Sequence, residues 1–232
     1  MRACTINGLK IHAPFTRDQL LEEAVRSNKM LVAINAEKIL NADENFKAIV
    51  NNNLGYPDGV GAVWALRQKG AIHAFKIPGC ELWLDLVKRY HLNSSFYLIG
   101  GSQKVIDATV IKLKFDYPGI DIKGWRNGFF HCTNEKSELI HTISKIKPNF
   151  VLVAMGSPRQ EELMARLVAA HPAVYQGLGG SFDVYVGETK RSPDFLSRNS
   201  LEWLYRLVLD PRRIFRQMSL IIFAFRLLLR QL

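Results

Sequence analysis

The chain has 232 residues, enough for one large domain, and its composition of 48% hydrophobic and 22% charged residues argues against intrinsic disorder. Its three cysteines are too widely spaced for a disulfide framework or a zinc pattern, which favours a reducing compartment. The sequence does not open on a long apolar segment, so no signal peptide is expected. The formal net charge of +10 indicates a polyanionic partner: nucleic acid, an anionic membrane surface or a phosphate-bearing substrate.

Hydrophobic periodicity predicts strands and helices that alternate along the chain. Helices are expected over residues 16–26, 37–50, 60–69, 78–90, 103–115, 135–146 and 158–170. Strands are expected over residues 30–34, 95–99, 120–123, 150–154 and 173–176, with a turn at 56–59. This alternation is typical of βαβ units, so we expect one α/β domain over residues 1–194, with helices on both faces of a mostly parallel sheet.

Polar and glycine residues follow several of these strands, where ligands bind in open parallel sheets. The strand ends carry Asn35, Gly100-Gly101, Gly156-Ser157-Pro158 and Gly177-Leu178-Gly179-Gly180. Such glycines can simply make tight turns, but three clusters favour a phosphate-bearing ligand that approaches the backbone closely. Ser157 is expected to cap the next helix. The chain has no P-loop, and Trp64 replaces the third glycine of a partial dinucleotide fingerprint, so neither an ATPase of that class nor an NAD enzyme is supported.

Asp58 has two interpretations. Tyr56-Pro57-Asp58-Gly59 is a standard turn sequence, in which proline fixes φ and glycine accepts positive φ. Alternatively, the carboxylate sits at the start of a helix and acts as general base towards a sugar hydroxyl. The six histidines show no ligand spacing, so nothing in the sequence requires a metal.

The last part of the chain carries most of the positive charge. From Lys190 onward there are nine basic and three acidic residues, and a helix is expected to begin at Asp210-Pro211. Its basic ridge, interrupted by Phe223, comprises Arg212, Arg216, Ser219, Arg226 and Arg230. The wide apolar arc beside the ridge predicts a helix lying in a membrane interface, since the run 220–225 is too short to span a bilayer. Packing against its own domain or a second subunit is the alternative, and nucleic acid is disfavoured.

Five ordered segments carry a resemblance to glycosyltransferase family 26, the TagA/WecG/CpsF group, over nearly the whole chain. They are LVAINAEKIL (31–40), YPDGVGAVWALRQKG (56–70), VAMGSPRQEE (153–162), GLGGSFDVYVGETKRSP (177–193) and LEWLYRLVLDPRRIFRQ (201–217). The resemblance implies a Rossmann-like core, a helical membrane-associating appendage over residues 195–232, inversion at the anomeric carbon, and no cofactor or metal.

By resemblance, Asp58 is the general base. The expected donor-binding residues are Asn35, Gly59, Lys76, Gly100, Gly101, Gly156, Ser157, Gln160, Glu161, Gly179, Gly180 and Asp183. The residues expected to hold the lipid diphosphate of the acceptor are Lys190, Arg191, Arg206, Arg212, Arg213 and Arg216, with Arg226 and Arg230 at the membrane surface. Many relatives have Arg-x-x-Gly-x-Asp-Leu where this chain has Lys76-Ile-Pro-Gly-Cys-Glu-Leu, which keeps the charge and loses bidentate geometry.

The resemblance is strongest to the branch that transfers N-acetylmannosaminuronate from UDP to N-acetylglucosaminyl-diphospho-undecaprenol in enterobacterial common antigen synthesis. It implies a peripheral protein on the cytoplasmic face of the bacterial inner membrane, and it leaves homo-oligomerisation open. Transfer of another sugar, or a non-catalytic nucleotide-sugar-binding protein at the membrane, are the alternatives.

Overall fold

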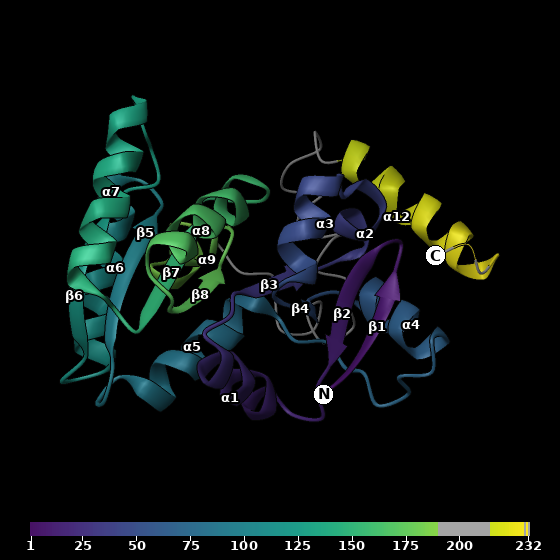
Figure 1. Ribbon diagram of the computed structural model, residues 1–232. Coiled ribbons are helices and arrows are strands. Elements are labelled where there is room, and N and C mark those ends of the chain that lie inside the picture. The colour runs from purple at the N-terminus through teal and green to yellow at the C-terminus, as the bar shows by residue number, and fades with distance from the viewer. Residues whose placement is uncertain (190–213, 230, 232) are drawn as a thin grey trace.

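Residues 1–189, 214–229 and 231 are described by the computed structural model, and they are arranged around one eight-stranded sheet (Figure 1). The strands are β1 (Arg2–Ile6), β2 (Leu9–Ala13), β3 (Leu31–Ile34), β4 (Leu54–Pro57), β5 (Ser95–Gly100), β6 (Asp121–Arg126), β7 (Phe150–Ala154) and β8 (Val174–Gly177). They lie in the order β1-β2-β4-β3-β8-β7-β5-β6. Only β1 and β2 pair antiparallel within this sheet, so the predicted mostly parallel sheet is confirmed.

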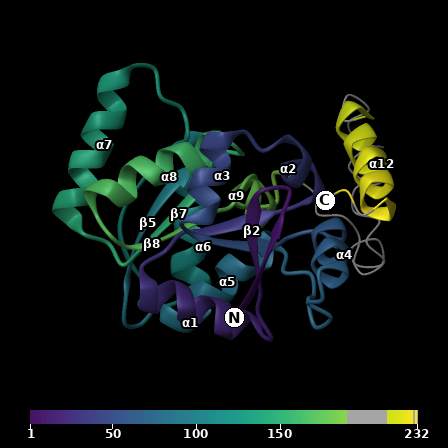
Figure 2. The same cartoon turned by 45° about the vertical axis from the view of Figure 1, so that its right-hand side comes forward.

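Helices cover both faces of the sheet, as predicted (Figure 2). They are α1 (Arg17–Ser27), α2 (Ala36–Asn41), α3 (Glu44–Asn51), α4 (Val60–Gln68), α5 (Gly79–Tyr90), α6 (Gln103–Asp116), α7 (Thr133–Ile146), α8 (Arg159–Ala170), α9 (Ser181–Tyr185) and α12 (Ile214–Leu228). Successive side chains of β7 alternate between the two layers: Val151 and Val153 join the core shared with α2, α3, α4, α7, α8 and α12, whereas Leu152 and Ala154 join that of α1, α5, α6 and α9. The unbroken apolar runs of the central strands follow from this two-sided burial.

Two sequence predictions for the first third of the chain are wrong. The single helix expected over 37–50 is two helices, because the Asp43 carboxylate accepts a 2.7 Å hydrogen bond from the Phe46 N–H and starts α3 as a separate element. Tyr56 and Pro57, expected in a turn, end the buried strand β4 instead. Pro57 sits at a strand end, where the missing N–H disturbs the ladder least.

Sequence reasoning missed the β1–β2 hairpin. Its connection is Asn7-Gly8, and both residues have positive φ, of 47° and 80°. Asn-Gly between short alternating segments is the strongest local signal for a hairpin, so the information was present in the sequence.

Helix α12 packs against the helices that follow β3 and β4 (Figure 1). Phe223 is buried, and its ring occupies the space beside Gly61, at 3.0 Å from where a β-carbon of that residue would lie. The Gln68 side chain donates a 2.8 Å hydrogen bond to the Leu227 carbonyl. Phe223 therefore does not merely interrupt a basic ridge; it anchors α12 to α4.

Over residues 220–229, most of the exposed side chains are large and apolar, and Arg226 is exposed among them. The exposed large apolar side chains of this helix and its surroundings are Ile221, Ile222, Phe225, Leu228 and Leu229, and Trp64 of α4 is 53% exposed. Across the described part of the chain, no helix has the length and apolar character needed to cross a bilayer. The expected domain boundary at 194/195 and the expected helix start at Asp210-Pro211 lie outside the described residues.

Candidate active site

The strand order brings the predicted strand-end residues to one edge of the sheet. The carboxyl ends of β4, β3, β8, β7 and β5 are neighbours in that order, because these five strands are parallel. Asp58 follows β4, Asn35 follows β3, and the Gly179 loop follows β8. Residues far apart in the sequence thus border the same edge.

Asp58 is a half-buried residue held between two helices. Its backbone N–H donates to the Ile34 carbonyl at 2.9 Å, which extends the β3–β4 ladder past the end of β4. Its carboxylate Oδ1 accepts a 2.9 Å hydrogen bond from the N–H of Gly79, the first residue of α5. The side chain is therefore oriented by an α5 backbone group in addition to its own position before α4.

The neighbours of Asp58 include two other predicted residues. A β-carbon at Gly59 would lie 3.5 Å from the Asn35 β-carbon, so the starts of α4 and α2 are adjacent. The Asn35 Oδ1 accepts from the Lys38 N–H at 2.9 Å and caps α2. The half-buried Lys76 lies in the segment between α4 and α5, and the Ile77 N–H holds this segment beside the end of β4 by donating to the Pro57 carbonyl at 2.8 Å.

Gln160 and Glu161 are buried in the first turn of α8 and belong to a chain of hydrogen bonds. The Gln160 Oε1 accepts from the Gly179 N–H at 2.9 Å, and its Nε2 donates to the Glu161 Oε1 at 3.0 Å. The same carboxylate oxygen accepts from the Lys38 Nζ at 2.9 Å, and that ammonium also donates to the Ala33 carbonyl at 2.8 Å. One end of the Gln160 amide faces the Gly179 N–H, which must meet the amide oxygen. The other end faces the Glu161 carboxylate, which must meet the amide nitrogen, so the orientation of the amide is fixed by its two partners.

The strand-end glycines fall into two groups. A β-carbon at Gly156, Gly179 or Gly180 would meet no atom within 4 Å, so these positions face open space, and the first two need glycine because their φ values are +77° and +61°. At Gly100, in contrast, a β-carbon would lie 2.2 Å from the Ala154 carbonyl oxygen. Internal packing accounts for glycine there, whereas the first group leaves room for a ligand.

The sequence grouped Gly177 with the glycines that follow β8, but the structure gives it a different role. A β-carbon there would lie 2.5 Å from the Gln160 Nε2, so this glycine makes room for the buried amide. We expect Gly177→Ala to displace Gln160 and to lower the free energy of unfolding by about 1–3 kcal/mol, as overpacking does. Urea denaturation checks this value. Gly180→Ala is the matched control, since its β-carbon meets nothing and its φ is −103°; an equal loss in both variants would contradict the explanation.

Lys38, Tyr56 and Gln176 were also not predicted as part of this region. Tyr56 and Gln176 are fully buried, and burial raises the pKa of the Tyr56 hydroxyl well above its ordinary value. Lys38 stands in a segment that carries the family resemblance, but its partner is 123 residues away, so only the fold reveals the pairing.

The other predicted residues are placed as follows. Ser157 is exposed and does not cap α8, whose N-cap is Pro158 without a side-chain hydrogen bond, so that prediction is wrong. Asp183 is half-buried in α9, and Arg226 is exposed on α12. Lys190, Arg191, Arg206, Arg212, Arg213 and Arg230, and the side chain of Arg216, lie outside the described residues.

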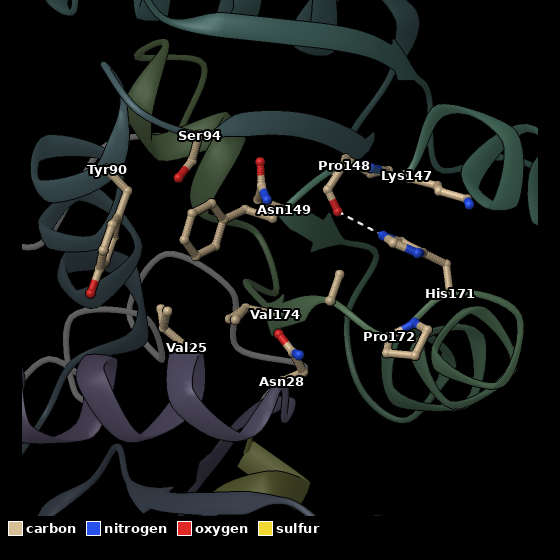
Figure 3. Close-up of a pocket in the computed structure, with 12 residues that line it drawn as sticks. Val25, Asn28, Tyr90, Ser94, Lys147, Pro148, Asn149, His171, Pro172 and Val174 are labelled. Carbon is tan, nitrogen blue, oxygen red and sulfur yellow. Dashed lines mark hydrogen bonds between the residues drawn. The ribbon is translucent and has the colours of Figure 1, made fainter.

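A metal cluster or a second hollow could also hold a ligand. Within the described ranges, no three His, Cys, Asp or Glu side chains are grouped closely enough to hold a metal ion. A hollow of about 330 Å³ lies where β7 and β8 begin, and Figure 3 shows its polar residues, with the His171 Nε2 2.9 Å from the Pro148 carbonyl. It therefore borders the amino edge of the sheet, away from Asp58.

Comparison with known protein families gives a match that covers nearly all of the sheet, the strand-end residues and α12. The model of the Glycosyl transferase WecG/TagA/CpsF family matches residues 4–232, which include both α12 and every strand-end residue described above. The chain belongs to the WecG/TagA/CpsF family of glycosyltransferases.

Proposed function

We propose that this glycosyltransferase moves N-acetylmannosaminuronate from UDP to N-acetylglucosaminyl-diphospho-undecaprenol with inversion. Family membership supports transfer of a sugar from a nucleotide donor to an acceptor. The observation that carries the assignment of the base is the 2.9 Å hydrogen bond from the Gly79 N–H to the Asp58 carboxylate, which fixes a carboxylate at the sheet edge where the Gly156 and Gly179 loops also lie.

In the proposed reaction, an acceptor hydroxyl oxygen attacks the anomeric carbon of the donor. The new C–O bond forms as the bond to the β-phosphate oxygen breaks, and UDP leaves with both bonding electrons. Asp58 takes the proton of the attacking hydroxyl. The negative charge that develops on UDP is met by the N-terminus of the twelve-residue helix α8 and by backbone N–H groups of the loops at Gly156 and Gly180, other than the Gly179 N–H, which already donates to Gln160.

The donor assay separates this proposal from its two rivals. Enzyme is mixed with lipid-linked N-acetylglucosamine and a panel of UDP-sugars, once with a divalent cation and once with EDTA, and lipid-linked disaccharide is measured. Product with the uronate donor supports the assignment, and product with another sugar alone reassigns the donor. No product with any donor would leave the non-catalytic binding protein, and activity lost to EDTA would contradict metal independence.

The proposed acceptor also requires contact with a membrane. The exposed apolar side chains of α12, and the exposed Trp64 of the α4 helix that α12 contacts, support a peripheral position on an anionic bilayer, and the basic residues near α12 in the sequence suit a lipid diphosphate. We propose the cytoplasmic face of the inner membrane as the location.

We expect Phe225→Ser to weaken binding to anionic vesicles by roughly tenfold, the scale of removing one large apolar side chain from the interface. Flotation with liposomes measures the bound fraction. Phe115→Ser is the matched control, because Phe115 is 82% exposed on α6, against 64% for Phe225, and lies on the other helical layer. Equal losses in both variants, or unchanged flotation after deletion of residues 212–232, would contradict membrane docking through α12.

A further inference from the structure

The hydrogen-bonded chain Lys38–Glu161–Gln160–Gly179 crosses the sheet edge from the loop after β3 to the loop after β8. Lys38 belongs to α2, the helix that Asn35 caps, and Glu161 belongs to α8, which follows β7. Since β8 lies between β3 and β7, the chain of contacts spans the central strand of the three. The segments that follow β3, β7 and β8 are thus joined by side chains.

This chain is buried and charge-assisted. The Glu161 side chain is 1% exposed and the Lys38 side chain 16% exposed, with 2.9 Å between the Nζ and the Oε1. The second carboxylate oxygen, Oε2, is buried and has no hydrogen-bond partner among the described residues. A buried pair with one unsatisfied oxygen adds little stability compared with well-packed apolar side chains, so stability alone does not explain it.

The local geometry indicates what the pair accomplishes. Lys38 fixes one oxygen of Glu161, that oxygen orients the Gln160 amide, and the amide oxygen holds the Gly179 N–H. Gly177 has no side chain at the place that the Gln160 amide occupies, and β-carbons at Gly179 and Gly180 would face open space. Through this chain the ion pair helps to hold the Gly177–Gly180 loop, together with the 2.8 Å hydrogen bond from the Leu178 N–H to the Val153 carbonyl.

We propose that Lys38 and Glu161 are positioning residues that hold the Gly177–Gly180 loop for the phosphates of the nucleotide-sugar donor. This inference rests on the proposed function. Asp58 is held separately, through the Gly79 N–H of α5. Loss of the ion pair therefore impairs donor binding and leaves the proton transfer to Asp58 largely intact.

The double variant Lys38→Met/Glu161→Met tests this, because apolar residues of similar length keep the packing and remove the chain of hydrogen bonds. We expect hydrogen–deuterium exchange of residues 177–180 to accelerate, and the donor KM to rise about tenfold, with kcat changed less than about threefold. Glu161→Gln keeps an oxygen for Lys38 and Gln160, so it should restore slow exchange and most of the donor affinity. Glu44→Gln, which removes the exposed pair with Lys47 on α3, should change neither.

Hydrogen exchange and calorimetry test the positioning role of Lys38 and Glu161 separately from the proposed sugar transfer. Exchange of the loop and calorimetric titration with UDP require no turnover, so they judge the ion pair even if no disaccharide forms. Unchanged exchange in a folded double variant would overturn the inference, as would a fall in kcat at constant KM. If the double variant does not fold, Gly177→Ala displaces the same Gln160 amide by crowding its Nε2, and the same two measurements decide.

Discussion

Asp58→Asn should lower kcat by about 10²–10⁴-fold, the usual contribution of a general base. The amide is isosteric with the carboxylate, and its oxygen can still accept the hydrogen bond from the Gly79 N–H, so the loop geometry is retained. What the variant loses is the ability to take a proton at neutral pH. Initial rates of disaccharide formation at saturating donor and acceptor measure the effect.

The control for this variant is another aspartate far from the edge. Asp121 begins β6, one of the two edge strands of the sheet, and pairs on the surface with Lys123 at 2.9 Å. Asp121→Asn should therefore change kcat less than about twofold. Unchanged donor affinity in Asp58→Asn, measured by calorimetry, would show that binding is intact. Full activity in Asp58→Asn would remove Asp58 from the reaction.

Lys38→Met should lower the free energy of unfolding by about 3–5 kcal/mol, because it leaves the buried Glu161 carboxylate without its cation. The Glu161 side chain is 1% exposed, so water cannot replace the ammonium group without local opening. Urea denaturation followed by circular dichroism measures the change. The double variant with Glu161→Met should recover most of the loss, since it removes the stranded charge.

Lys47→Met provides the comparison for that loss. Lys47 pairs with Glu44 at 2.8 Å, but the Glu44 side chain is 91% exposed, so removal of the pair should cost less than about 1 kcal/mol. A Lys38→Met variant as stable as Lys47→Met would mean that the Glu161 carboxylate finds another partner or takes up a proton.

Much of the α/β architecture could be predicted from the sequence, and its errors have local causes. Amphipathic helices such as α6 and buried strands such as β7 follow from periodicity, which depends only on neighbouring residues. The split between α2 and α3 was missed because the apolar spacing continues across Asp43, and only the capping hydrogen bond reveals the break. β4 was missed because a proline turn sequence overlaps the end of the strand.

The site was predictable only in part. The residues alone left Asp58 between a plain turn and a general base, and only the family resemblance implied Gln160. In the fold, Asp58 accepts from the α5 backbone, whereas Gln160 is buried and holds a loop. The partnership of Lys38 with Glu161 could not be predicted, because it depends on β8 lying between β3 and β7. Periodicity within one segment contains no information about that order.

The order of the strands also has a consequence for how the enzyme matures. β1, β2, β3 and β4 come from residues 2–57 and form one half of the sheet, whereas β5 to β8 come from residues 95–177 and form the other, and the two halves meet at β3 and β8. A ribosome must therefore release residue 177 before β3 gains its second neighbour. Asp58 and Asn35 emerge early, and a chain cut short before β8 would carry both of them without the Gly177–Gly180 loop.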